Sequence, residues 1–233
     1  MDYQMNQTSK IYMTDAQGMR WVNADYVKEV ADDIVDFGGN HAIDGNDLDM
    51  KRDGIWRIFR VRAMWLLILT AFGILTSSII AGQAELLDKA IILAAFLPAI
   101  VDMGGNSASQ VATLVIRSIA LQDLKVRAKD VFLVLKKEIV IATMLACVVA
   151  LAEVVMAHFT KSPGGDILLV VGVSMFACTV TGSIIGAVLP FAAKKFGADP
   201  ATLSSPMLTS ICDFVGVLIY LGFAMVILGG NLV

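Results

Sequence analysis

Five long apolar runs follow a mostly polar first quarter and dominate the pattern of hydrophobic and polar positions along the chain. The first of these runs begins at Ala63. The runs cover residues 63–84, 86–120, 139–159, 167–193 and 206–228. About 20 apolar residues are enough for a helix to cross a bilayer. The pattern therefore predicts an all-α, polytopic membrane protein with five transmembrane helices per subunit.

The second run is too long for one simple transmembrane helix. Its 35 residues, 86–120, would form a helix of roughly 50 Å, whereas the hydrocarbon core is about 30 Å thick. The run also contains Pro98 and the pair Gly104-Gly105, residues that interrupt helices. We therefore expect the second span to be broken at Pro98 and at the Gly-Gly-Asn motif, which leaves two half-segments.

Composition and charge agree with a membrane protein. The hydrophobic fraction is 57%, the mean hydropathy is +0.74 and only 17% of residues are charged, which is below the usual share in soluble domains. With five spans, thirteen bases fall on one side: Lys51, Arg52, Arg57, Arg60, Arg62, Arg117, Lys125, Arg127, Lys129, Lys136, Lys137, Lys194 and Lys195. Only Lys89 and Lys161 fall on the other. The positive-inside rule then predicts a plasma-membrane protein with a cytoplasmic N-terminus and an outside C-terminus, and no nucleic-acid partner.

The first fifty residues form an acidic arm with ten acidic and three basic residues. A helix is expected from Asn23 to Gly38, where Asp25, Glu29, Asp32 and Asp36 would share one face. Such a stripe is either an ordinary solvated face or a place where a divalent cation relieves repulsion. The predicted organisation is an acidic arm and linker over 1–50, an interfacial connecting helix over 51–62 and a pore domain over 63–233.

Three of the five spans contain an acidic residue at membrane depth: Asp102, Glu153 and Asp213. A carboxylate there costs roughly 3 kcal/mol or more if it faces lipid, so such residues usually mark an ion path. The fifth span places Thr209, Asp213, Gly216 and Tyr220 on one helical face, with Ser205 near its start. This polar stripe on an apolar helix is the strongest candidate for a cation pathway.

The residue types point to a hard cation bound through oxygen. The chain has two His residues and three Cys residues, too few for a soft-metal cluster. Magnesium keeps several of its waters and touches only one or two carboxylates, a style that suits Asp213 and Asp102 with Asn106, Thr209 and the backbone of Gly105. A twofold homodimer would bring two Asp213 carboxylates to one axis, which motivates a dimeric pore.

Distinctive motifs stand at the entry to the first span, around the Gly-Gly-Asn motif and near the end of the chain: Arg62-Ala63-Met64-Trp65, Pro98, Met103-Gly104-Gly105-Asn106, Gln110, Lys137-Glu138, Asp199-Pro200-Ala201, Ser205-Pro206 and Thr209-Ser210-Ile211-Cys212-Asp213-Phe214-Val215-Gly216. Through these motifs, residues of about 60–230 show a resemblance to the MgtE family of magnesium channels and transporters. It implies a homodimer whose central pore is lined by the second and fifth spans. It further implies that Asp213 holds a largely hydrated Mg²⁺ and that Glu85 and Asp88 lie near the outer mouth.

Two features depart from the family pattern. Asp102 stands where that pattern usually has a small uncharged residue. The first fifty residues are too few for the pair of CBS domains that the family often carries before the first span. The resemblance thus supports Mg²⁺ as the transported ion but leaves its regulatory role open, together with Mn²⁺, Co²⁺ and Ni²⁺ as further ions.

Three functions compete at this point. The first is a passive magnesium channel, which is not an enzyme. The second is a divalent cation exchanger coupled to Na⁺ or H⁺, with Asp102 or Glu153 as the relay. The third is an intramembrane aspartyl protease with Asp102 and Asp213 as a dyad, but the Tyr-Asp and Gly-x-Gly-Asp motifs of such enzymes are absent from the sequence.

Overall fold

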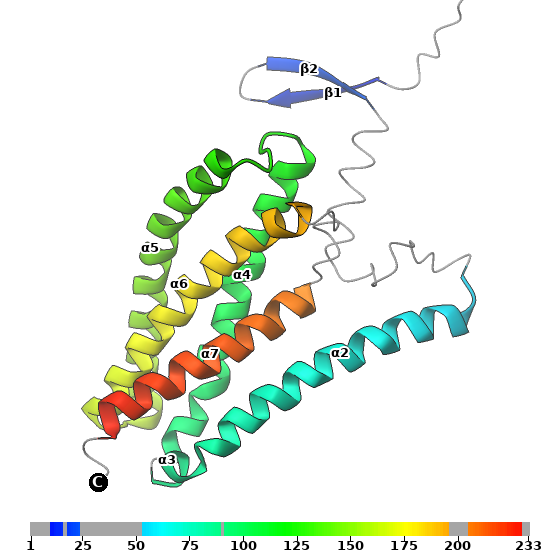
Figure 1. Ribbon diagram of the computed structural model, residues 1–233. Helices are drawn as coiled ribbons and strands as arrows, with labels where there is room; N and C mark the ends of the chain where they lie inside the picture. The colour runs from blue at the N-terminus through cyan, green and yellow to red at the C-terminus, as the bar shows by residue number, and fades with distance from the viewer. Residues whose placement is uncertain (1–9, 16–17, 24–52, 90, 196–204, 230–233) are drawn as a thin grey trace, which may run out of the picture.

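The computed structural model describes residues 10–15, 18–23, 53–89, 91–195 and 205–229. Five helices within these ranges are long and apolar enough to cross a membrane, which confirms the predicted membrane architecture of five helical spans. The spans lie in α2 (Ile55–Gly82), in α4 (Leu97–Ala120) together with the residues from Ile91 that precede it, and in α5 (Ala128–Lys161), α6 (Gly165–Lys195) and α7 (Ser205–Leu228). Successive long helices run in opposite directions (Figure 1). The end of the bundle where α4 connects to α5 is called the upper end, and the end where α5 connects to α6 is called the lower end (Figure 1).

The second predicted span is interrupted, but the predicted position at Gly104-Gly105 is wrong. A short helix α3 (Ala84–Lys89) and a 3₁₀ segment η2 (Ile91–Ala95) precede α4, which begins at Leu97 with Pro98 in its first turn. Proline is tolerated there because the first backbone N–H groups of a helix have no partner in the helix. Helix α4 then continues through the glycine pair without a break, since neighbouring helices pack closely against these glycines.

The N-terminal region contains a hairpin that the sequence analysis missed. Strand β1 (Lys10–Asp15) pairs antiparallel with β2 (Gly18–Asn23), with Lys10 opposite Asn23. Asn23, expected to cap an acidic helix, instead ends β2. The rest of that expected helix and its acidic stripe lie outside the described residues. Of the connecting helix expected over 51–62, residues 55–62 form the first turns of α2, whereas residues 53 and 54 precede the helix.

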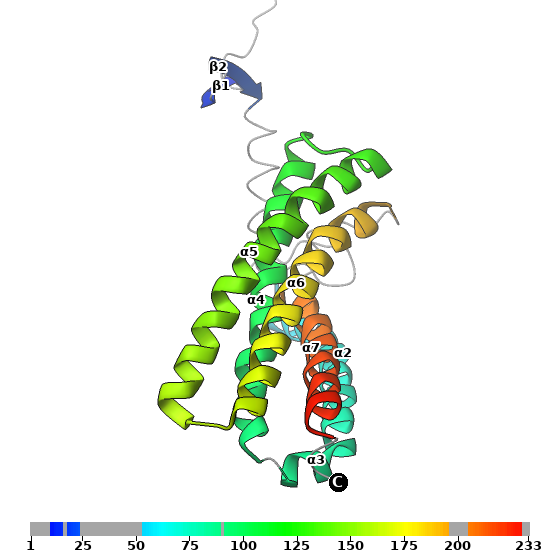
Figure 2. The same ribbon diagram turned by 90° about the vertical axis from the view of Figure 1, so that its left-hand side faces the viewer.

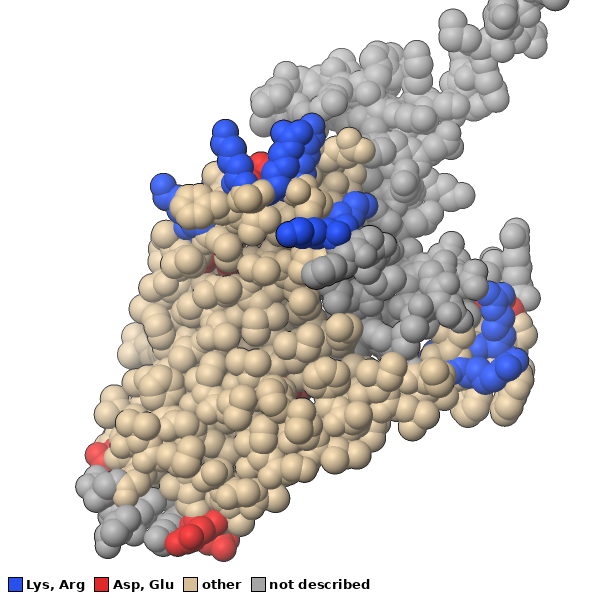
Figure 3. Space-filling model, viewed as in Figure 1, with Lys and Arg blue, Asp and Glu red and all other residues tan. Residues whose placement is uncertain are grey.

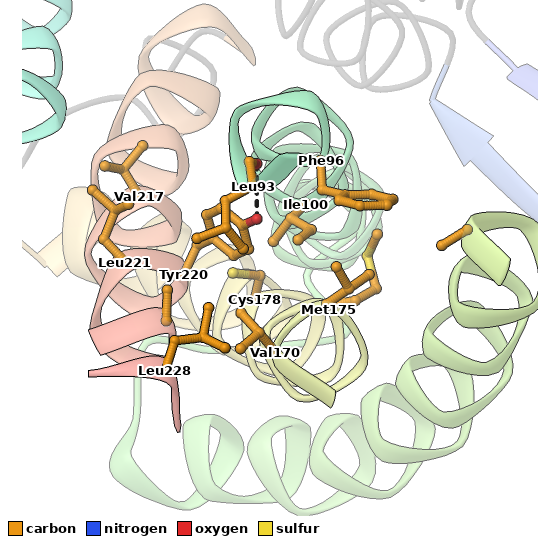
Figure 4. Close-up of a cluster of buried hydrophobic side chains, with 13 residues drawn as sticks. Leu93, Phe96, Ile100, Val170, Met175, Cys178, Val217, Tyr220, Leu221 and Leu228 are labelled. Atoms are coloured by element: carbon orange, nitrogen blue, oxygen red, sulfur yellow. Dashed lines mark hydrogen bonds between the residues drawn. The ribbon is translucent and has the colours of Figure 1, made fainter. Parts of the chain in front are cut away.

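Helices α4 and α6 form the centre of the bundle. Helix α5 lies on one side of this pair, and α7 and α2 lie on the other (Figure 2). A large apolar cluster near the lower end joins the start of α4, the first half of α6 and the last half of α7 (Figure 4). A second, smaller cluster joins the same three helices nearer the upper end, around Ala108, Ile116 and Leu208. Asp102 of α4 and Asp213 of α7 lie at the level between these two clusters.

A buried hydrogen bond fixes the 3₁₀ segment before α4. The Tyr220 hydroxyl of α7 donates to the backbone carbonyl of Leu93 at 2.8 Å, and both residues are fully buried (Figure 4). A 3₁₀ segment makes poorer internal hydrogen bonds than an α-helix, so its carbonyls need outside partners in an apolar setting. Tyr220 is the last member of the predicted polar stripe on α7. Its hydroxyl group therefore holds the backbone of the 3₁₀ segment in place.

We expect Tyr220→Phe to lower the free energy of unfolding by about 0.5–1.5 kcal/mol, because it removes one of the two hydrogen bonds that the buried Leu93 carbonyl accepts, the other coming from the Phe96 N–H. Thermal unfolding of the detergent-solubilised protein measures this loss. The matched control is Thr70→Val on α2, since the exposed Thr70 hydroxyl only adds a bond to the carbonyl of Leu66 in its own helix. Equal unfolding midpoints for Tyr220→Phe and the wild type would contradict the assigned role.

Candidate cation pathway

Helices α4 and α6 approach each other through glycine. A Cβ atom placed on Gly182 would lie 2.1 Å from the backbone oxygen of Gly104, and one placed on Gly186 would lie 2.2 Å from that of Ala108. These separations are far below van der Waals contact, so only glycine fits at either position. Gly182 and Gly186 of α6 therefore act in helix packing.

Helix α7 packs on α4 through two further close contacts. A Cβ atom on Gly105 would lie 3.1 Å from the Thr209 methyl carbon, and one on Gly216 would lie 3.4 Å from the Cα atom of Val101. Thr209 and Gly216 are seven residues apart, which is two helical turns, so they mark one face of α7. Asp213 lies between them on this same face. The structure therefore turns the predicted polar stripe of α7 towards α4.

The Asp213 and Asp102 side chains lie close enough to interact electrostatically, although they come from different helices. Asp213 is half-buried, whereas Asp102 is exposed on the surface of the single chain. The Asn106 side-chain amide donates a hydrogen bond of 2.8 Å to the Asp102 carboxylate one turn away. Five of the predicted site residues thus meet at one level of α4 and α7: Asp102, Gly105, Asn106, Thr209 and Asp213.

Helix α4 carries a polar face that nothing in the described chain covers. Asp102, Asn106 and Gln110 follow each other at four-residue spacing, and all three are exposed. Arg117 continues the exposed face towards the upper end. Polar side chains facing hydrocarbon are costly, so such a face borders water or another protein surface. This face is the one that a cation pathway would need.

The structure does not bring every predicted residue to this place. Asp88 is exposed on α3 at the lower end, apart from the cluster on α4 and α7. The backbone of Ser205 begins α7, but its side chain lies outside the described residues. Glu153 is half-buried on α5, which lies across α4 and α6 from α7 (Figure 2).

Charged side chains separate along the bundle in the way the five-span interpretation requires. Lys and Arg gather at the upper end and at the start of α2, whereas Asp and Glu mark the lower end, where α3 and the start of α6 lie (Figure 3). Glu85, Asp88 and Asp166 belong to these lower elements. The long surface between the two ends is almost free of charge in this view. This banding is typical of a protein that spans a bilayer.

One chain does not build a closed metal cage. Within the ranges that the structure describes, no three or more His, Cys, Asp or Glu side chains lie together as a metal site. Asp213 and Asp102 form a pair at most. An ion that keeps most of its waters needs only such sparse contacts, whereas a dehydrated Ca²⁺ takes six to eight oxygen ligands.

A family model described as "Divalent cation transporter", MgtE, matches residues 97–223, which contain the whole Asp102–Asp213 cluster. The chain belongs to the MgtE family. It is therefore a helical membrane protein of a transporter family and not an enzyme.

Curated relatives agree with this MgtE assignment. The chain is 35% identical over 201 residues to the magnesium transporter MgtE of Thermus thermophilus, covering 86% of this chain and 43% of that protein. It is 27% identical over 202 residues to the magnesium transporter MgtE of Bacillus subtilis, covering 85% of this chain and 42% of that one. The chain thus spans less than half the length of these relatives.

A second polar group of this MgtE-family chain was not predicted from the sequence. Glu138 of α5 is buried, and so are Ser183 of α6 and Ser107 of α4 beside it. A signal was available, because Glu138 shares a helical face with Ala142, Ala146 and Ala157, small residues that are all buried. The neighbouring Lys136 and Lys137 instead made Glu138 look like an ordinary charge at the end of a span.

Proposed function

We propose that this chain forms a passive channel for Mg²⁺, with the pathway lying between two copies of the chain and Asp213 of each copy facing it. The observation that carries the proposal is the group of Asp213, Asp102 and Asn106 on α4 and α7. These side chains lie at membrane depth between two apolar clusters, where carboxylates are retained for function. The magnesium transporters among the curated relatives support the choice of ion.

The chemistry of the group suits a hydrated divalent ion. Mg²⁺ holds its waters tightly and is bound through one or two carboxylates. Asp213 and Asp102 supply negative charge, and the Asn106 amide holds the Asp102 carboxylate in one orientation. Thr209 and the backbone of Gly105, which meet where α7 crosses α4, would contact the outer side of the hydration shell. Ser205 at the start of α7 and Asp88 at the lower end would lie along the route on either side.

Two copies explain the exposed polar face of α4. A homodimer would place the Asp102, Asn106 and Gln110 faces around one axis and so shield them from lipid. It would also supply four carboxylates around the ion in place of two. Closed twofold symmetry is the commonest arrangement for such assemblies. The charge banding favours a plasma-membrane orientation with the N-terminus in the cytoplasm and the C-terminus outside.

A passive channel needs no coupling ion. A divalent cation gains about 4.6 kcal/mol for each 100 mV of membrane potential, which is enough to drive uptake. Passage of Mn²⁺, Co²⁺ or Ni²⁺ and regulation by Mg²⁺ through the acidic arm remain predictions.

Reconstituted liposomes separate the channel from an exchanger. We expect Mg²⁺ entry to follow the imposed Mg²⁺ gradient and membrane potential, and to keep the same rate when Na⁺ or H⁺ gradients are imposed or removed. A fluorescent Mg²⁺ indicator inside the liposomes reports the rate, and protein-free liposomes give the background. An exchanger would instead show flux that depends on the Na⁺ or H⁺ gradient and is lost in Glu153→Gln or Asp102→Asn.

A further inference from the structure

A buried polar chain links three helices away from the candidate pathway. Glu138 of α5, Ser183 of α6 and Ser107 of α4 are 8%, 0% and 7% exposed. The hydroxyl oxygens of Ser107 and Ser183 lie 2.6 Å apart, and Ser183 also hydrogen bonds with the Glu138 carboxyl group. The Glu138 Oε1 atom is buried and has no hydrogen-bond partner among the described residues.

No cation neutralises this carboxyl group within the described part of the chain. On α6 the charged residues are Asp166 at one end and Lys194 and Lys195 at the other, and the two lysines are exposed. On α4 they are Asp102 and Arg117, both exposed and on either side of Ser107. On α5 itself Lys136 and Lys137 are exposed, while Lys129, Asp130, Glu153, His158 and Lys161 lie two or more turns away along the helix. An ionised Glu138 would therefore be a buried charge without a partner, which is strongly unfavourable.

The oxygen atoms present suit a proton better than a metal ion. Helices α5 and α6 run without a break past Glu138 and Ser183, so the backbone carbonyls of these two residues stay in the helical hydrogen bonds. Only the carboxyl group and two hydroxyls are then available, which is too few for the oxygen shell of a dehydrated Na⁺, Mg²⁺ or Ca²⁺. A proton needs one acceptor. A protonated Glu138 donates to the Ser183 oxygen and Ser183 donates to the Ser107 oxygen. Among the described residues this leaves only neutral groups unpaired, the Glu138 carbonyl oxygen and the Ser107 hydroxyl hydrogen.

We propose that Glu138, Ser183 and Ser107 form a proton-binding site, in which Glu138 carries the proton and the two serines continue the hydrogen-bond chain to α4. The proton comes from water and returns to water, so one O–H bond forms at Glu138 on binding and breaks on release. Ser107 directly follows Asn106, whose side chain lies on the exposed polar face of α4. The site therefore joins α5 and α6 to the helix that borders the candidate pathway, and release of the proton places an unpaired charge at this junction.

Infrared difference spectroscopy of the full chain in liposomes tests the site without any transport measurement. The spectrum of the wild type minus that of Glu138→Gln should contain the carbonyl stretch of a protonated carboxylic acid at neutral pH, and this band should disappear as the pH is raised. Glutamine has nearly the shape of neutral glutamic acid, so we expect the variant to fold. Glu153→Gln, which changes another acid of the same helix, is the matched control and should leave the band in place.

Ser183→Ala gives a second, independent measurement. Removing the hydroxyl takes away the acceptor for the Glu138 proton, so the band should move to higher wavenumber, as for a carboxylic acid with a weaker hydrogen bond. The proposal is overturned if the wild type and Glu138→Gln have the same spectrum at every pH, or if the band is lost in Glu153→Gln. It is also overturned if Ser183→Ala leaves the band unshifted. None of these results depends on whether the chain conducts Mg²⁺.

Discussion

Asp213→Ala should reduce Mg²⁺ entry into liposomes to the level of protein-free liposomes. The reason is electrostatic. Asp213 lies on the face of α7 that crosses α4, close to Asp102, and its removal deletes the more buried of the two negative charges at this level. Without that charge, a divalent ion has little to offset the cost of entering the low-dielectric centre of the membrane. Indicator fluorescence inside liposomes, at matched protein content, measures the flux.

Two further variants make the Asp213 experiment specific. Asp166→Ala removes an exposed acid from the first turn of α6 at the lower end, and it should keep wild-type flux. Asp102→Asn should give an intermediate loss, because it removes the charge beside Asp213 while keeping a polar group next to Asn106. Flux in Asp213→Ala equal to that of the wild type would refute the place of Asp213 in the pathway.

The second large effect is expected from Gly182→Ala, which should prevent the protein from folding stably. The added methyl carbon would lie 2.1 Å from the Gly104 carbonyl oxygen. The obstacle is backbone, so α4 and α6 would have to separate along their length. Overpacking costs about 1–3 kcal/mol where side chains can adjust, and a rigid obstacle raises this cost. Size-exclusion chromatography and thermal unfolding in detergent would show aggregation or a much lower midpoint.

Gly222→Ala is the matched control for this substitution. Gly222 lies inside α7, and apart from the adjacent backbone of its own helix no atom lies within 4 Å of the position that its Cβ would take. Alanine there should leave stability unchanged or raise it by about 0.5–1 kcal/mol, because alanine favours the helix more than glycine does. If Gly182→Ala unfolds at the same temperature as the wild type, the close crossing of α4 and α6 is wrong.

The spans could be predicted from sequence because the membrane imposes a local constraint. An apolar run must be about as long as the bilayer is thick, and each helix satisfies its backbone within the run itself. The apolar run 206–228 therefore matches α7 closely. The face of α7 was also readable, since Thr209, Asp213 and Gly216 fall on one side by helical spacing alone.

The structure around Gly104 and Gly105 could not be predicted from the local sequence. A glycine pair in an apolar run fits either a break or a close approach of another helix, and the choice depends on residues far away in sequence. Gly182 and Thr209 decide it, because they occupy the space beside the pair. Glu138 was missed for the same reason. Its burial comes from Ser183 and Ser107, which are 45 residues later and 31 residues earlier in the chain.

The glycine contacts between α4 and α6 restrict how this bundle can move. Sliding one helix along the other by a single residue would put a side chain where Gly182 or Gly186 now touches backbone, and packed interfaces of this kind do not deform gradually. Helices α4 and α6 must therefore travel together as one rigid body. A conformational change in this protein would therefore move the other helices, such as α7, against that fixed pair.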